Sequence, residues 1–167
     1  MKLKAERLSK EGFSEFGFYA DLLNPKSNRF GESPVEFFPD MVQMRLVANV
    51  ASMSSVVVHP REYVIDGAEY HSHTCEATLP IDGDIFIHVG PPTKGDVPYD
   101  SMRVFRVPKG TIVVLKPGVW HGAPFAAGGK RQSALVILPE RTYANDCFFV
   151  DIPKEKRLEI DICEDEK

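Results

Sequence analysis

The sequence predicts an all-β protein, a sandwich or barrel of short strands with one short helix ahead of it. From Leu46 onward, short segments rich in β-branched and apolar residues follow one another, and turn residues such as Lys116-Pro117-Gly118 separate them. The chain has 167 residues, which suits one domain with a sizeable core. The expected strands are Met53–Val58, Glu69–His73, Ala77–Pro80, Ile85–Val89, Met102–Val107, Thr111–Leu115, Ser133–Leu138 and Phe148–Ile152.

The first part of the chain has a different character. A short helix is expected over Ser9–Gly17, because Ser9 can cap it and Phe13 and Phe16 share one face. Residues 24–40 mix Pro, Gly, Asn and Ser and predict an irregular loop. We therefore expect a single domain divided into an N-terminal helix and loop region, a barrel and a C-terminal tail, over residues 1–45, 46–153 and 154–167.

Composition excludes several classes of function. The net charge is −4 and the basic residues are scattered, so no nucleic-acid surface is expected. No apolar run approaches the ~20 residues of a membrane helix, and the charged N-terminus does not read as a signal peptide. The cysteines, Cys75, Cys147 and Cys163, are few and unclustered, which favours a reducing compartment and predicts a cytoplasmic protein.

Three histidines and a glutamate form a candidate metal site. His71 and His73 are two residues apart in an expected strand, so their side chains share a face. Glu76 has the opposite parity and needs a bulge or turn to join them. His121 lies 48 residues after His73 and joins only if a second strand runs beside the first. The set suits one divalent transition metal, Zn, Ni, Mn, Fe or Co, with positions open for water or substrate. The alternative is that these are ordinary strand and core residues.

Other residues could take part in chemistry at such a site. Glu69 shares strand parity with His71, which makes it a candidate catalytic base, or else a solvated charge at the barrel rim. Arg131 or Arg141 could bind a substrate carboxylate. Trp120 is either a pocket wall or a core aromatic residue, and the second is favoured.

A predicted hairpin bears on the remaining histidines. Asp82-Gly83 is a strong two-residue turn signal, and direct pairing of the flanking strands would put Ile85, Ile87 and Glu76 on one face. His88 would then point away from the site and would not be a ligand. His59, before Pro60, is expected to be structural or exposed.

Two segments resemble the motifs of a known superfamily. Gly67-x3-His71-x-His73-x2-Glu76-x6-Gly83 resembles the first cupin motif, and Gly110-x6-Pro117-Gly118-x2-His121 resembles the second. The resemblance implies a cupin-type double-stranded β-helix, or jelly-roll, barrel.

A second resemblance extends over most of the chain. Segments including Leu8–Gly17, Ala77–Pro80, Gly118–Pro124 and Asn145-Asp146-Cys147 are similar to ureidoglycolate lyases. This family implies a homodimer in purine and allantoin breakdown that cleaves a small anionic substrate, ureidoglycolate, into glyoxylate and urea. The sequence departs from the family at His73 and Glu76, where an apolar residue and a glutamine are common.

Together these features favour a metal-dependent carbon–nitrogen lyase acting on ureidoglycolate or a related small hydroxy acid. The alternatives are a metal-dependent cupin of another class, such as a sugar isomerase or dioxygenase, and a non-catalytic binder of a small ligand. Metal identity would separate a dioxygenase from the others, and urea release would single out the lyase.

Overall fold

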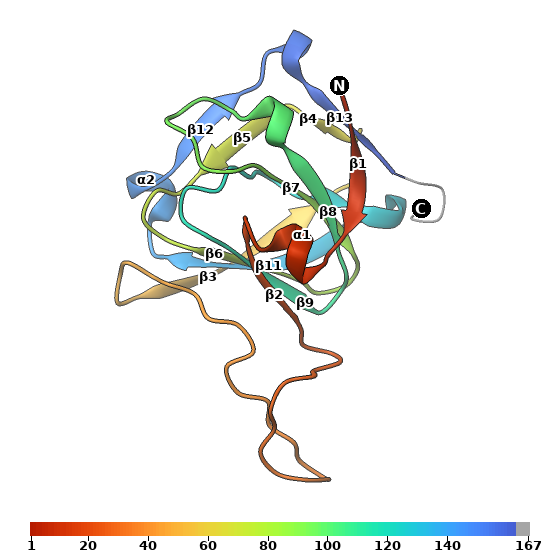
Figure 1. Ribbon diagram of the computed structural model, residues 1–167, viewed down its shortest axis with the longest axis vertical. Helices are drawn as coiled ribbons and strands as arrows, with labels where there is room; N and C mark the ends of the chain where they lie inside the picture. The colour runs from red at the N-terminus through yellow and green to blue at the C-terminus, as the bar shows by residue number, and fades with distance from the viewer. Residues whose placement is uncertain (163–167) are drawn as a thin grey trace.

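Short strands fold into two curled sheets and a two-stranded ribbon in the computed structural model, which describes residues 1–162 (Figure 1). The six-stranded sheet has the order β10-β7-β8-β1-β13-β4 and the five-stranded sheet the order β2-β9-β6-β11-β3, while β12 pairs with β5. The predicted all-β jelly-roll barrel is confirmed.

The bounds of most expected strands agree with the structure to within two residues, apart from the strand carrying His71, which ends earlier. The strands are β1 (Lys2–Arg7), β2 (Gly17–Asp21), β3 (Ala51–Val58), β4 (Val64–Ile65), β5 (Gly67–Tyr70), β6 (Glu76–Pro80), β7 (Ile85–Val89), β8 (Arg103–Val107), β9 (Thr111–Leu115), β10 (Phe125–Ala126), β11 (Gln132–Pro139), β12 (Phe148–Asp151) and β13 (Leu158–Asp161). The helical segments are α1 (Lys10–Phe13), α2 (Thr142–Asn145), and the 3-10 turns η1 (Tyr99–Ser101), η2 (Ala127–Gly129) and η3 (Lys154–Lys156).

The sheets draw on residues on both sides of the 46–153 segment that we expected to form the barrel. β1 lies inside the six-stranded sheet, parallel to β8 and to β13. Every second residue of β1 and β13 faces the core, so Ala5, Leu158 and Ile160 are buried while the charged residues between them are not. Residues 163–167 of the expected tail, with Cys163, lie outside the described residues.

The N-terminal helix is shorter than expected. Ser9 does cap it, because its Oγ accepts a hydrogen bond of 3.0 Å from the Gly12 N–H. Gly17, however, starts β2 instead of ending the helix. A Cβ atom at Gly17 would lie 2.0 Å from the carbonyl oxygen of Val114, so glycine allows β2 to approach β9 closely.

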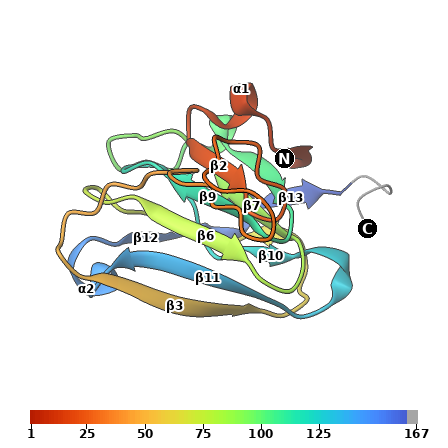
Figure 2. The same ribbon diagram turned by 90° about the horizontal axis from the view of Figure 1, so that it is seen from below.

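The hairpin predicted at Asp82-Gly83 is wrong. β6 pairs with β9 and β11, whereas β7 pairs with β8 and β10, so the chain crosses between the two sheets at this turn. Figure 2 shows β6, β11 and β3 side by side. The Asp82 carboxylate accepts a 2.6 Å hydrogen bond from the Ser133 N–H, which fixes the turn to β11.

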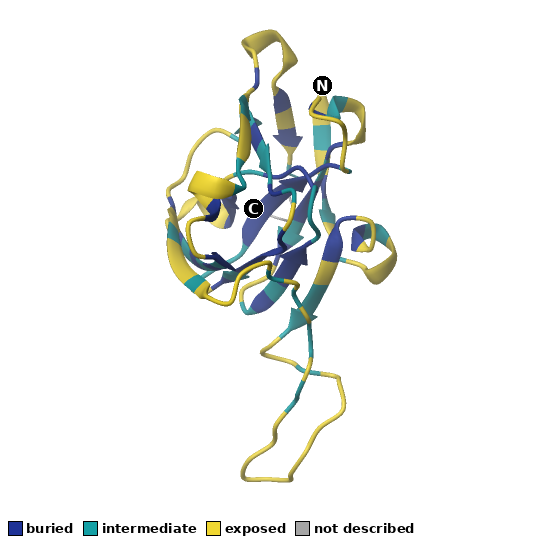
Figure 3. Ribbon diagram, turned by 90° about the vertical axis from the view of Figure 1, so that its left-hand side faces the viewer, coloured by how far each residue is buried: buried dark blue, intermediate teal, exposed yellow. Residues whose placement is uncertain are grey.

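Residues 22–50 form an arm that projects from the barrel between β2 and β3 (Figure 1). Most of the arm is exposed (Figure 3), as expected for the irregular loop predicted over residues 24–40. Backbone hydrogen bonds between Phe30 and Phe37 hold its two sides together, and both side chains are more than 60% exposed.

Two clusters of buried side chains make up most of the core. Ile85, Ile87 and Val89 of β7 pack with Phe13 and Phe16, and the opposite face of β7 packs into a second cluster that includes Trp120. No helix within the described residues has the length and apolar character to cross a membrane.

Candidate metal centre

Backbone pairing brings the two cupin-like motifs together. The N–H of Glu69 donates to the His121 carbonyl (2.7 Å), and the N–H of His121 donates to the Glu69 carbonyl (2.8 Å). The Gly118 N–H donates to the His71 carbonyl at 2.7 Å, from a turn in which Gly118 has φ +82°, a conformation that favours glycine. His121 was expected to join the site only if a second segment ran beside the strand that leads to His71. The segment around His121 does so.

Nε2 of His71, Nε2 of His121 and Oε2 of Glu76 converge at the end of β5. Nδ1 of His71 lies 2.6 Å from the Asp146 carbonyl oxygen and Nδ1 of His121 lies 2.9 Å from that of Val119. Since a carbonyl only accepts, each Nδ1 carries the proton and each Nε2 is free to bind something else. Both Nε2 atoms point at Oε2 of Glu76, at 3.1 and 3.3 Å. Only protons or a cation placed among these atoms can make this arrangement favourable.

The spacing of these atoms fits a transition-metal ion. Ligand atoms held at about 2.0–2.2 Å from one ion lie about 3 Å from each other. The Glu76 contacts match that value, and Glu69, His71 and His121 also offer ligand atoms that all lie within 4.8 Å of one another. Hydrogen bonds from each Nδ1 to a backbone carbonyl are the usual support of metal-binding histidines. The residues thus fit a divalent cation.

Without a metal, the pair of Glu76 and His121 is charged. Burial alone would raise the pKa of Glu76, but the charge and hydrogen bond of His121, with those of His71, lower it to about 2. Burial would lower the pKa of His121, yet Glu76 outweighs burial and raises it to about 9. A proton on His121 therefore occupies the place that a metal ion would take.

His73 does not join the other three candidate ligands. β5 ends at Tyr70, so the alternation expected through residue 73 stops before it. The His73 side chain is 73% exposed and its Nδ1 lies 3.2 Å from Oδ1 of Asp146. The ligand atoms of Glu69, His71 and His121 lie together, and Glu76 joins them through its contacts with both imidazoles. Glu76 reaches the histidines because residues 71–75 form a turn between β5 and β6.

Asp146 supports His71 and was missed by the analysis of sequence patterns. Its carboxylate accepts hydrogen bonds from the N–H groups of Ser72 (2.8 Å) and His73 (2.9 Å), and its carbonyl accepts from His71. Burial opposes the charge of Asp146, but these N–H groups lower its pKa overall. The residue belongs to the Asn145-Asp146-Cys147 segment, whose resemblance to relatives was its only signal.

Glu69 faces the same cavity and has its own partner. Its Oε1 lies 4.0 Å from Nε2 of His121, and its Oε2 accepts a 3.1 Å hydrogen bond from the Cys147 thiol. Burial, together with the Glu69 carboxylate, raises the pKa of Cys147 to about 12. Tyr143, from α2, packs edge-on against His71, and burial and the nearby carboxylates raise its pKa. No pattern in the sequence singled out Tyr143.

These side chains enclose a cavity of about 120 Å³, the metal-facing cavity. Thr78 and Ile87 line it with Glu69, Glu76 and His121, although Ile87 belongs to the other sheet. Trp120 lies in the core and its Nε1 donates to Thr93, as expected for a packed aromatic residue. Of the proposed carboxylate-binding arginines, Arg131 pairs with Asp82, and exposed Arg141 precedes α2; neither lines the cavity. His59 is exposed.

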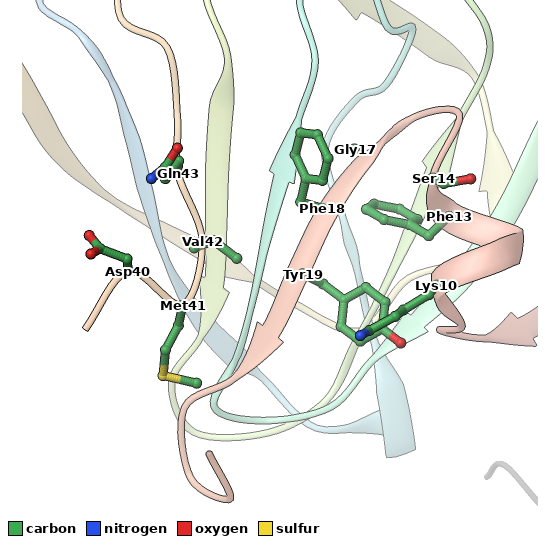
Figure 4. A pocket seen from close by; sticks show the side chains of 10 residues that line it. All are labelled: Lys10, Phe13, Ser14, Gly17, Phe18, Tyr19, Asp40, Met41, Val42 and Gln43. Atoms are coloured by element: carbon green, nitrogen blue, oxygen red, sulfur yellow. The ribbon is translucent and has the colours of Figure 1, made fainter. Parts of the chain in front are cut away.

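A larger cavity of about 470 Å³ lies elsewhere, between α1, β2 and the returning part of the arm (Figure 4). Phe13, Phe18 and Tyr19 line it on one side and Asp40 to Gln43 on the other. Its polar lining side chains are Lys10, Ser14, Tyr19, Asp40 and Gln43.

Comparison with known proteins identifies the family of this chain. The family profile described as Ureidoglycolate lyase matches residues 1–159. The chain belongs to the ureidoglycolate lyase family. Among solved structures it is similar to a dTDP sugar isomerase from Desulfovibrio desulfuricans G20, with 14% identity, a TM-score of 0.51, and coverage of 84% of this chain and 87% of the isomerase.

A partial similarity relates this ureidoglycolate lyase family member to an oxalate decarboxylase of Bacillus subtilis, with 19% identity and a TM-score of 0.43 over 60% of the chain. The chain spans 23% of the decarboxylase's length. No curated protein sequence matches the chain. The similarity to the isomerase extends over most of both chains and agrees with the barrel fold.

Proposed function

We propose that this protein is a metal-dependent lyase that cleaves ureidoglycolate, or a closely related small hydroxy acid, into glyoxylate and urea. The observation that carries the proposal is the convergence of two imidazole nitrogens and a carboxylate oxygen in a member of the ureidoglycolate lyase family. His71, Glu76 and His121 would hold one divalent ion. When bound, such an ion lowers the pKa of a coordinated hydroxyl group and fixes the substrate's orientation.

Glu69 is the residue best situated to move the proton. In ureidoglycolate one carbon carries a hydroxyl group, a carboxylate and a ureido nitrogen. Cleavage removes the hydroxyl proton, forms the carbonyl of glyoxylate and breaks the carbon–nitrogen bond, and the departing nitrogen gains a proton to give urea. The Glu69 carboxylate can accept the first proton and donate it to the nitrogen, so the step needs no other reactant. The Cys147 thiol donates a hydrogen bond to Oε2 of Glu69, so Oε1 of Glu69 is the oxygen that faces His121.

Metal content and urea release test the proposal separately. We expect close to one transition-metal ion per chain by elemental analysis, and its loss together with activity in His121→Ala. Glu69→Gln should retain the metal but release urea about 10²–10⁴-fold more slowly, the range for losing a general acid–base group. Release of no urea from either ureidoglycolate enantiomer by metal-loaded protein would overturn the lyase assignment.

We also propose that the protein is a homodimer. β3 is an edge strand of the five-stranded sheet, and its Met53 and Val57 side chains are exposed. The arm adds exposed Phe30 and Val35. Such edges and apolar side chains are usually covered. Light scattering at micromolar concentration should give the mass of a dimer, and a monomer at every concentration would contradict the proposal.

A further inference from the structure

A second pocket opens beside the metal-facing cavity. It has a volume of about 360 Å³ and shares Glu69, Gly122 and Ala123 with that cavity. Gly67 also lines it, and Gly67 and Glu69 alternate onto the same face of β5. This adjoining pocket therefore continues the metal-facing cavity along β5. Small-molecule sites usually measure about 300–1,000 Å³, so most of the room for a substrate lies in the adjoining pocket.

His88 lines the adjoining pocket and lacks a well-formed hydrogen bond. The residue is 2% exposed, and neither ring nitrogen makes a hydrogen bond of good geometry within residues 1–162, although a weak contact with the Gly67 backbone opposes the fall of its pKa. Burial lowers its pKa to about 3, so the ring is neutral and offers one donor and one acceptor. A Cβ atom at Gly122 would lie 2.8 Å from Nε2 of His88, so the glycine leaves space beside this buried nitrogen. Buried polar groups in folded proteins nearly always have a partner, and a bound molecule can supply it.

Arg61 is held rigidly at the same pocket. Its Nη2 donates to the carbonyls of Ala123 (3.0 Å) and Pro124 (3.1 Å), and its guanidinium lies 4.1 Å from the centre of the Phe125 ring. Its Nε and Nη1 donate to no acceptor in the described part of the chain. A fixed guanidinium with free N–H groups is well suited to bind a carboxylate.

The remaining charged residues of the adjoining pocket define the rest of a ligand. Arg157 adds a second cation, whereas Asp66, Asp151 and Glu69 add carboxylates. A simple anion would be attracted by the two arginines but repelled by the three carboxylates. A small acid that carries N–H groups as well as a carboxylate can satisfy both kinds of residue.

We propose that the adjoining pocket binds the carboxylate end of a small ureido or amide-bearing acid through Arg61, with His88 as its second hydrogen-bonding group. This inference rests on the proposed function, because it assigns to the same substrate the part that lies away from the metal centre. Arg61 thus binds the substrate carboxylate, the role for which the sequence analysis considered Arg131 and Arg141.

N-carbamoylglycine is a suitable probe because it has the carboxylate and ureido groups but no hydroxyl to eliminate. With wild-type protein, phenylglyoxal labelling followed by peptide mass spectrometry measures the reactivity of each arginine. We expect N-carbamoylglycine to slow labelling of Arg61 several-fold and to leave the exposed Arg29 unchanged. N-carbamoylglycinamide, which lacks the charge, should protect much less. Equal labelling of Arg61 with and without the acid would overturn the proposal.

Calorimetry on variants gives an independent measurement. Arg61→Gln should weaken binding of N-carbamoylglycine at least tenfold, and His88→Leu about tenfold, the loss expected for one or two buried hydrogen bonds. Arg29→Gln is the matched control and should bind as wild type. Metal content should stay the same in all three variants. Unchanged affinity in folded Arg61→Gln and His88→Leu would overturn the pocket assignment even if urea is released, whereas protection of Arg61 without urea release would overturn only the lyase.

Discussion

Replacing Asp146 with asparagine should loosen His71 without changing any atom that could bind a metal. Each carboxylate oxygen of Asp146 accepts one backbone N–H, from Ser72 at 2.8 Å and from His73 at 2.9 Å. Asparagine keeps one of these acceptors and turns an NH₂ group toward the other N–H. The backbone carbonyl of residue 146 remains, so Nδ1 of His71 still has its acceptor.

The size of the effect follows from the bond that is lost. A hydrogen bond to a charged group contributes about 1.5–3 kcal/mol. The free energy of unfolding should therefore fall by about 2 kcal/mol, which lowers Tm by about 4–8 °C in a chain of this size. Loss of groups that orient a metal ligand commonly weakens metal binding about 10–100-fold, and we expect the lower end because the His71 bond is retained.

Thermal unfolding of the metal-free protein measures the first quantity, and Co(II) titration against a competing chelator measures the second. Asp100→Asn is the matched control, since Asp100 is exposed and its side chain makes no hydrogen bond among the described residues. An Asp146→Asn protein with wild-type Co(II) affinity would refute the idea that Asp146 positions His71.

Three further predictions concern charge and burial. The pair of Glu76 and His121 has a pKa of about 9 for His121 and about 2 for Glu76. The pair should therefore stabilise the metal-free protein most between pH 4.5 and 6.5, and this contribution is lost as pH rises through 9 or falls through 2. Because His121 is protonated at pH 7.5, metal binding at that pH should release close to one proton, measurable by calorimetry in two buffers. His88→Leu should raise Tm by about 2–12 °C, because an unsatisfied buried group costs about 1–3 kcal/mol; a lower Tm would contradict the absence of a well-formed hydrogen bond. Cys147 should react slowly with iodoacetamide at pH 7.5, and Glu69→Gln should speed its labelling, as followed by mass spectrometry, because removing the carboxylate lowers the thiol pKa.

The sequence predicted the barrel because alternating apolar residues and turn signals depend on local chemistry. Five strands were missed, namely β1, β2, β4, β10 and β13. Of these, β1 and β13 also alternate, but their polar residues are charged and they lie next to the chain ends. Their pairing with each other is between residues that are far apart in the sequence. Local patterns carry no information about such contacts. The prediction of a hairpin at Asp82-Gly83 was wrong for the same reason, because the partners of β6 and β7 lie elsewhere in the sequence.

Spacing predicted the candidate site in part. His71 and His121 could be found because the two motifs are tied to turns, and Glu69 because it shares a strand face with the position of His71. Asp146, Tyr143 and the pocket around His88 depend on how α2 and the segment after His121 fold back, which no spacing encodes.

Of the two candidate ligands that lie closest to His71 in the sequence, Glu76 and not His73 belongs to the metal centre. Glu76 contacts both imidazoles, whereas His73 is exposed. Glu76→Gln keeps the size of the side chain but removes the charge that attracts a cation. We therefore expect this variant to fold and to lose most of its metal, whereas His73→Ala should keep the wild-type amount in elemental analysis. Loss of metal from His73→Ala with full retention in Glu76→Gln would reverse the argument, because the ligand set would then have to include the exposed histidine.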